Sequence, residues 1–146
     1  MALHNILVRA HPADVWEVLA DPYSYSEWVL GTKEIDSADP DWPAATSAFQ
    51  YVAGLGPFRF GSKTVVREVD RPRRLEMEAD ARILAARVAI SVRAWGDGSL
   101  VVLEEHWIRG PYLLLDNPLI DLALNIRNRM MVRNLAALVE RRSGVR

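Results

Sequence analysis

The strongest constraint on the fold lies near the end of the chain, where residues from about 118 to 142 have the spacing of one long amphipathic helix. The chain opens with a short strand, Leu3 to Arg9, which leads into a second helical segment beginning at Pro12. Nearly everything between these two ends has the alternation of β-strands. One long helix packed on a sheet predicts an α+β domain with two layers and a hollow between them.

The helical segment near the N-terminus carries the expected start and stop signals. Pro12 suits the first turn of a helix, and Asp14 adds a negative charge where the helix dipole favours it. The segment ends before Pro22, and Tyr23 to Val29 is then expected to form a second short helix anchored by Trp28. Two short helices should therefore follow the first strand.

The middle of the chain predicts about six further strands, so the mainly antiparallel sheet should contain about six to seven. The clearest strand alternates apolar and charged residues, which is typical of a half-buried antiparallel strand. A Gly-Asp-Gly hairpin turn precedes the last strand. The expected strands are Thr32 to Ser37, Thr46 to Ala53, Phe58 to Val69, Leu75 to Ala81, a strand from Val88 to Ala94, and Leu100 to Arg109.

The composition excludes several classes of protein. Eighteen basic residues nearly balance nineteen acidic ones, so bulk charge favours neither nucleic acid nor a membrane surface. The chain has no cysteine, its three histidines are scattered and no metal motif is present, so we expect neither a metal nor a cofactor. No apolar stretch could span a bilayer and no signal-peptide pattern is present, which predicts a cytoplasmic protein.

Three stretches carry a family resemblance: His11 to Pro22 followed by Trp28, Val66 to Leu75, and the Gly96-Asp97-Gly98 hairpin with the strand and helix after it. Together they resemble the START-like (SRPBCC) superfamily, which includes the major birch-pollen allergen, and within it the bacterial polyketide cyclase/dehydrase-like branch. The resemblance implies a helix-grip fold, with a curved sheet around the long C-terminal helix, as a single ligand-binding domain over residues 1–146. Members bind lipids, hormones, polyketides or proteins, so the resemblance leaves the ligand open.

The long helix contains a charge where an apolar side chain is expected. A helical-wheel projection places Arg127 and Asn134 near the middle of a broad apolar arc, with Ala123 and Met130 on one side of that arc. An inward guanidinium needs a partner, because unpaired burial of a charge is costly. Arg127 therefore anchors a ligand carboxylate, enolate or phosphate, pairs with a carboxylate on the sheet, or reaches solvent at the cavity mouth.

The last strand offers a partner for that charge in either of two phases. Adjacent Glu104 and Glu105 must point to opposite faces of the sheet. One phase turns Glu104 and His106 toward the cavity, and the other turns Glu105 and Trp107 toward it. We prefer the first phase, in which Glu104 and His106 would move protons and Arg127 would steady an enolate. In the other interpretation His106 is hydrogen-bonded or meets water at the sheet edge.

Aromatic and sulfur-containing side chains are candidates for the remaining cavity wall, although such residues also suit ordinary core packing. The hydroxyl group of Tyr51 is the most useful of these, since it can orient a polar group of a ligand. The expected ligand-binding residues are Trp28, Tyr51, Phe58, Phe60, Met77, Trp107, Ala123, Arg127, Met130 and Asn134.

Three functions stay open. The first is binding of a small hydrophobic molecule, lipid or polyketide-like, by a carrier or sensor without a cofactor. The second is a polyketide cyclase or dehydratase that uses His106, Glu104 and Arg127. The third, implied by the co-chaperone branch of the superfamily, is a protein-interaction module. We expect a monomer or homodimer without nucleic acid or membrane insertion, and the apolar run Pro111 to Leu115 is a lid, a dimer patch or a buried connector.

Overall fold

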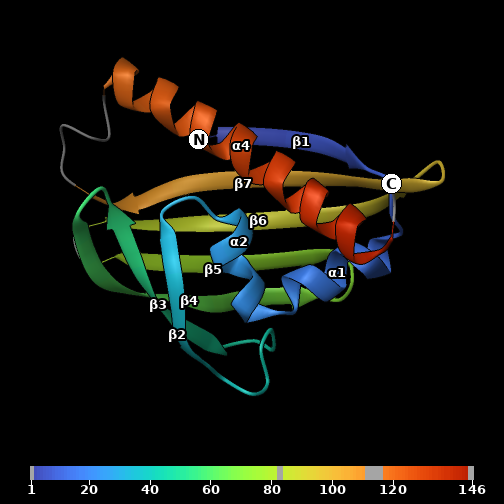
Figure 1. Ribbon diagram of the computed structural model, residues 1–146, viewed down its shortest axis with the longest axis horizontal. Helices are drawn as coiled ribbons and strands as arrows, with labels where there is room; N and C mark the ends of the chain where they lie inside the picture. The colour runs from blue at the N-terminus through green and yellow to red at the C-terminus, as the bar shows by residue number, and fades with distance from the viewer. Residues whose placement is uncertain (1, 82–83, 111–116, 145–146) are drawn as a thin grey trace.

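The fold is known from a computed structural model that describes residues 2–81, 84–110 and 117–144. In these ranges, a first strand is followed by three short helical segments, six further strands and a long helix. Figure 1 shows their arrangement. The elements are β1 (Ala2–Val8), α1 (Pro12–Leu19), η1 (Pro22–Ser24), α2 (Tyr25–Trp28), β2 (Thr32–Ala38), β3 (Ala48–Leu55), β4 (Phe58–Asp70), β5 (Arg74–Ala81), β6 (Leu84–Trp95), β7 (Gly98–Arg109) and α4 (Pro118–Arg142).

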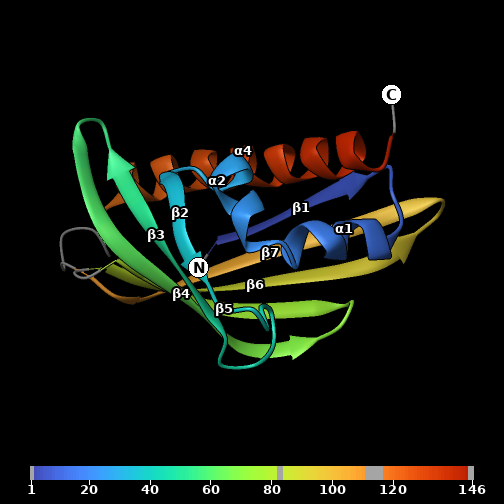
Figure 2. The same cartoon turned by 60° about the horizontal axis from the view of Figure 1, so that its bottom comes forward.

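The seven strands form one antiparallel sheet in the order β1-β7-β6-β5-β4-β3-β2. The first strand therefore pairs with the last, while β2 lies at the opposite edge. Figure 2 shows that the sheet curves and that α1, α2 and α4 all lie on its concave side. The helix-grip α+β architecture predicted from the sequence is confirmed.

The helix boundaries follow the local signals in the sequence. The two predicted helices that begin at proline, α1 and α4, start at Pro12 and Pro118. The side chain of Asn117 caps α4, because its Oδ1 accepts a hydrogen bond from the backbone N–H of Leu119 at 2.9 Å. The short helix predicted from Tyr23 to Val29 is divided into η1 and α2.

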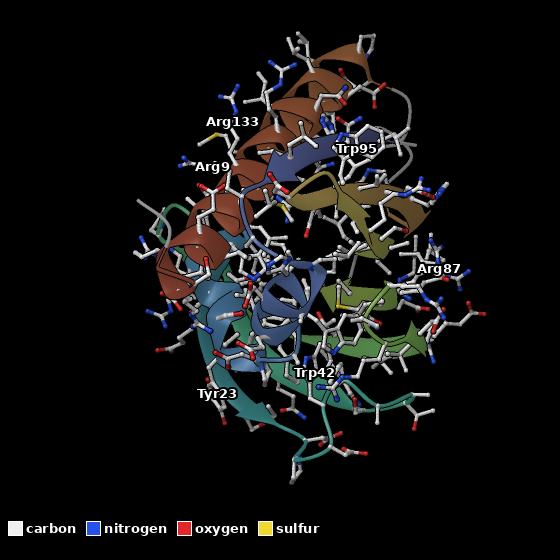
Figure 3. All side chains as sticks on the ribbon, turned by 90° about the vertical axis from the view of Figure 1, so that its right-hand side faces the viewer. Arg9, Tyr23, Trp42, Arg87, Trp95 and Arg133 are labelled. Carbon is white, nitrogen blue, oxygen red and sulfur yellow. The ribbon has the colours of Figure 1, made fainter. Side chains whose placement is uncertain are left out.

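A packed core forms where α1 lies between the sheet and the C-terminal half of α4. Figure 3 looks onto this end of the molecule, where α1 fills the space beneath α4. At the exposed edge of this core, Arg142 forms ion pairs with Asp21 at 3.0 Å and with Glu27 at 3.3 Å. The largest fully buried side chains of this core include Trp16, Leu19, Leu75, Ile90 and Leu135.

Candidate ligand-binding site

A pocket of about 340 Å³ lies at the other end of the molecule, between the N-terminal half of α4 and the sheet. This volume falls within the range of small-molecule sites, and most of the lining is apolar. The wall is formed by α2, the segment that follows it, the inner faces of β3 to β7, and α4. Side chains that line it include Trp28, Tyr51, Met77, Trp107, Leu124 and Met131.

The hollow arises because side-chain size falls along the central strands. In the packed core, β5 and β6 oppose Leu75 with Ile90, and neither is exposed. Four residues further along β5 the opposing pair is Ala79 with Ala86, and both line the pocket. Alanine does not reach the helix above, so the space between the layers stays open.

Three polar side chains bond to one another at this wall, and we call them the polar cluster: Arg127, Glu105 and Asn128. Arg127 and Glu105 line the pocket, and Asn128 is fully buried beside them. The Nη1 atom of Arg127 lies 3.5 Å from Glu105 Oε2 and donates to Asn128 Oδ1 at 3.2 Å. Asn128 Nδ2 donates in turn to Glu105 Oε1 at 3.3 Å. Each member therefore contacts both others, which fixes the orientation of all three.

Arg127 also fastens α4 to the segment after α2. Its Nε and Nη2 atoms donate to the backbone carbonyl of Leu30 at 3.3 and 3.1 Å. Glu105 on β7 is only 5% exposed and Asn128 is fully buried, whereas the Arg127 side chain is 33% exposed. The charge thus lies at the border between the pocket and solvent. Two of the alternatives left open by the sequence are therefore both present, because Arg127 pairs with a carboxylate on the sheet and also reaches the mouth of the cavity.

Four aromatic residues of the wall carry a polar atom, namely Tyr25, Trp28, Tyr51 and Trp107. Burial raises the pKa of the Tyr51 hydroxyl, and the nearby charge of Arg127 acts in the opposite direction. The phenol is therefore neutral at neutral pH and can donate a hydrogen bond. The indole Nε1 of Trp28 is buried without a hydrogen-bond partner among the described residues.

The structure brings six of the ten predicted ligand-binding residues to the pocket and places four elsewhere. Phe58 is exposed at the start of β4, and Ala123 and Met130 are exposed on α4. Asn134 is half-buried on α4 but does not line the pocket. The six residues at the pocket are Trp28, Tyr51, Phe60, Met77, Trp107 and Arg127.

The preferred phase of the last strand is wrong. Glu105 and Trp107 face the pocket, whereas His106 is exposed and Glu104 is partly exposed on the outer face of β7. Glu104 and His106 therefore do not share the cavity with Arg127. Each phase of this strand carries one glutamate and one aromatic or imidazole ring, so alternation alone did not distinguish them.

The predicted inward arc of α4 also needs correction, because the buried side is rotated from it. The fully buried Asn128 was missed, although it precedes buried Met131, Val132 and Leu135 by three, four and seven residues. That spacing on a single helix face is the signal that could have found it.

The remaining predictions concern the apolar run before α4, metal binding and membrane insertion. The apolar run from Pro111 to Leu115 lies outside the described residues. Within the described ranges, no three His, Asp or Glu side chains gather as they would around a metal ion. None of the described helices is both long enough and apolar enough to cross a membrane.

Residues 4–140 match the family described as "Polyketide cyclase / dehydrase and lipid transport", and the chain belongs to this family. The resemblance to the polyketide cyclase/dehydrase-like branch of the START-like superfamily is thereby confirmed. No curated protein sequence matches the chain.

Solved structures with the same fold include one described as an aromatase/cyclase and one described as an ARO/CYC protein. The Zhui aromatase/cyclase from Streptomyces sp. R1128 has a TM-score of 0.78 at 13% identity, over 97% of this chain and 94% of that one. The di-domain ARO/CYC StfQ of the steffimycin pathway has a TM-score of 0.75 at 12% identity over 99% of this chain. This chain covers 51% of StfQ, about half its length.

A third structure with this fold is protein CV1439 from Chromobacterium violaceum. Its TM-score is 0.72 at 15% identity, and the match covers 95% of this chain and 96% of that one. At such identities the likeness of all three structures concerns the fold alone.

Proposed function

We propose that this protein binds an uncharged, largely apolar small molecule in the pocket beneath the N-terminal half of α4, as a carrier or sensor. The pocket carries the proposal, because a space of about 340 Å³ with a mainly apolar wall stays open between the layers. The family description names both polyketide chemistry and lipid transport, which fits a lipid or polyketide-like ligand.

The charges of the wall favour an uncharged ligand. Among the described lining residues, the only acidic and basic side chains are Glu105 and Arg127, and they are paired with each other. An anionic ligand would have to compete with Glu105 for the guanidinium and would bring a second negative charge beside a buried carboxylate. A carbonyl or hydroxyl group of the ligand avoids both costs and can accept a hydrogen bond from Arg127 or Tyr51.

A polyketide cyclase or dehydratase is the second candidate. The family description and the two similar structures described as aromatase/cyclase or ARO/CYC support it. Since Glu104 and His106 lie outside the pocket, proton transfer would fall to Glu105 with Arg127 beside it. Both carboxylate oxygens of Glu105 already accept hydrogen bonds, so we favour binding over proton transfer.

The unfilled pocket also favours a small molecule over the third possibility, a protein-interaction module. A protein that binds partners through its outer surface does not need an open space in its interior, and side chains that filled the space would stabilise the fold. Native mass spectrometry of freshly purified protein should therefore show a co-purified small molecule.

A fluorescence titration tests the proposal directly. N-phenyl-1-naphthylamine, an uncharged apolar probe, should bind with saturation and more tightly than the anionic anilinonaphthalene sulfonate. Ala86→Leu narrows the pocket and should weaken binding of the uncharged probe about tenfold. The control is Ala94→Leu, an exposed position on the same strand, which should leave binding unchanged.

Two results would contradict small-molecule binding at this site. One is the absence of saturable binding by the wild-type protein. The other is equal affinity of the uncharged probe for the wild type and for Ala86→Leu, since a probe bound elsewhere would not sense the narrowed pocket. Tighter binding of the anionic probe would overturn the choice of an uncharged ligand.

A further inference from the structure

We propose that the outward face of the N-terminal half of α4 docks the protein on an anionic lipid surface. Four large apolar side chains form this face, which we call the outer stripe: Leu119, Leu122, Ile126 and Met130. They are exposed by 75%, 57%, 50% and 46%. Their spacing of three and four residues places them on one side of the helix.

The outer stripe lies opposite the side of α4 that faces the sheet. In the same turns, Leu124 and Met131 line the pocket and Asn128 is buried. This part of the helix is therefore apolar on two opposite sides, and in Figures 1 and 2 no described element covers the outer one. A contiguous apolar surface of this kind marks an interaction site.

The charges beside the stripe identify the occupant. Arg129 and Arg133 are exposed on the same side of α4, and neither has an ion-pair partner in the described parts of the chain. Glu140 also lies toward this side but contacts Arg9. Asp121 is exposed in the first turn, and helical periodicity places it away from the stripe. An apolar stripe bordered by arginines is typical of a helix that lies in the interface of an anionic bilayer.

The same charges disfavour a second copy of the chain. In a two-fold symmetric pair the stripes would face each other, and Arg129 and Arg133 of both copies would share one interface. Like charges held together in this way repel. A surface of acidic headgroups has no such conflict.

The inference stands apart from the proposed function, but the two fit together in space. The outer stripe occupies the turns of α4 that roof the pocket, so a docked protein would hold the pocket beside the lipid. A sparingly soluble ligand could then pass between bilayer and pocket over a short path.

Vesicle flotation tests the apolar part of the inference. The wild type should float with vesicles of phosphatidylcholine mixed with phosphatidylglycerol and should bind vesicles of phosphatidylcholine alone much less. The double variant Leu122→Gln with Ile126→Gln should lose about tenfold or more in vesicle affinity. The matched control is Leu3→Gln with Leu7→Gln, two comparably exposed leucines on the face of β1 turned away from α4, and it should bind like the wild type.

A second pair of variants tests the charges. Arg129→Glu with Arg133→Glu should abolish the preference for phosphatidylglycerol. Arg71→Glu with Arg93→Glu makes the same change in net charge at exposed positions elsewhere, and it should keep that preference. All four positions are exposed, so circular dichroism melting should show that each variant stays folded.

Three outcomes would overturn the inference. The first is that the wild type fails to float with the mixed vesicles. The second is that the control variants lose binding as much as the stripe variants do. The third is a concentration-dependent dimer, seen by light scattering, that the Leu122→Gln/Ile126→Gln variant lacks, because that result assigns the stripe to a second copy.

Discussion

The two halves of α4 cover the same sheet in different ways. The C-terminal half buries an almost continuous apolar side, with Met131, Val132, Leu135, Leu138 and Val139 all nearly inaccessible. The N-terminal half spans a pocket, and its most apolar side faces outward. One helix therefore serves two purposes: its C-terminal half completes the core, and its N-terminal half covers the pocket.

The difference originates in what lies beneath each half. Under the C-terminal half, α1 inserts Trp16 and Leu19, and the sheet contributes Leu75 and Ile90. Under the N-terminal half, α2 contributes Tyr25 and Trp28 to one wall of the pocket, and the sheet contributes alanines such as Ala86. The polar cluster then supports α4 across the gap by means of directional contacts rather than bulk.

Matched leucine truncations should show the largest contrast between the halves. Leu135→Ala removes a fully buried side chain and should lower the free energy of unfolding by about 2–5 kcal/mol. Leu124→Ala removes a half-buried side chain that borders an existing space, and we expect a loss of about 1 kcal/mol or less. Urea denaturation measures both, and equal losses would contradict the division of the helix into two halves.

Replacing an alanine by leucine should also cost more stability in the packed half than at the pocket. Ala136→Leu adds volume to the packed half and should cost about 1–3 kcal/mol of stability through overpacking. Ala86→Leu adds the same volume at the pocket and should change stability by no more than about 0.5 kcal/mol. The same urea experiment applies, and a large cost at Ala86 would mean that the pocket cannot accept a side chain.

Truncation of a single amide tests whether the polar cluster supports the open half. Asn128→Ala leaves Glu105 Oε1 and one N–H of Arg127 without this partner, which should cost about 1–3 kcal/mol. Asn134→Ala, a half-buried amide on the same helix, is the control and should cost no more than about 0.5 kcal/mol. If the two variants unfold at the same urea concentration, the cluster does not stabilise the helix.

The smallest expected effect is on how the free energy of unfolding changes with pH in alkaline solution. Burial raises the pKa of Tyr51 above its ordinary value of 10.0, so the folded state holds the phenolic proton more tightly than the unfolded state does. This contribution is fully present below about pH 10 and is lost as the pH rises toward the folded-state pKa. Urea unfolding at rising alkaline pH should therefore show a shallower decline for Tyr51→Phe than for the wild type. Tyr23→Phe, at an exposed tyrosine, should follow the wild type, and identical profiles for all three proteins would contradict the role of Tyr51.

Much of the fold could be predicted because its signals are local. The prolines at positions 12 and 118 begin the two main helices, and both helices start there in the structure. Alternation located β4, β5 and β7 to within about two residues at either end. The pocket could be predicted only as a consequence of the family resemblance and of a helix lying on a curved sheet.

The site was less predictable because it depends on which side of each element faces in. On α4, the residues of the outer stripe are apolar although they are exposed. The predicted inward arc was therefore placed near Met130, whereas the buried side contains Asn128. On β7, both faces carry a glutamate, so the choice between Glu104 and Glu105 had no local signal. Neither error affects the element boundaries, so the prediction of the fold stays correct despite both.

The order and approximate bounds of the elements follow from the amino-acid sequence, which also identifies Arg127 as a charge in need of a partner. The contacts of Arg127 with Glu105 and Asn128, and the presence of apolar residues on two sides of α4, become visible only in the folded protein. Start signals and alternation act between near neighbours along the chain. The inward face of a helix or strand, by contrast, is chosen by contacts between residues far apart in sequence, such as Arg127 with Leu30.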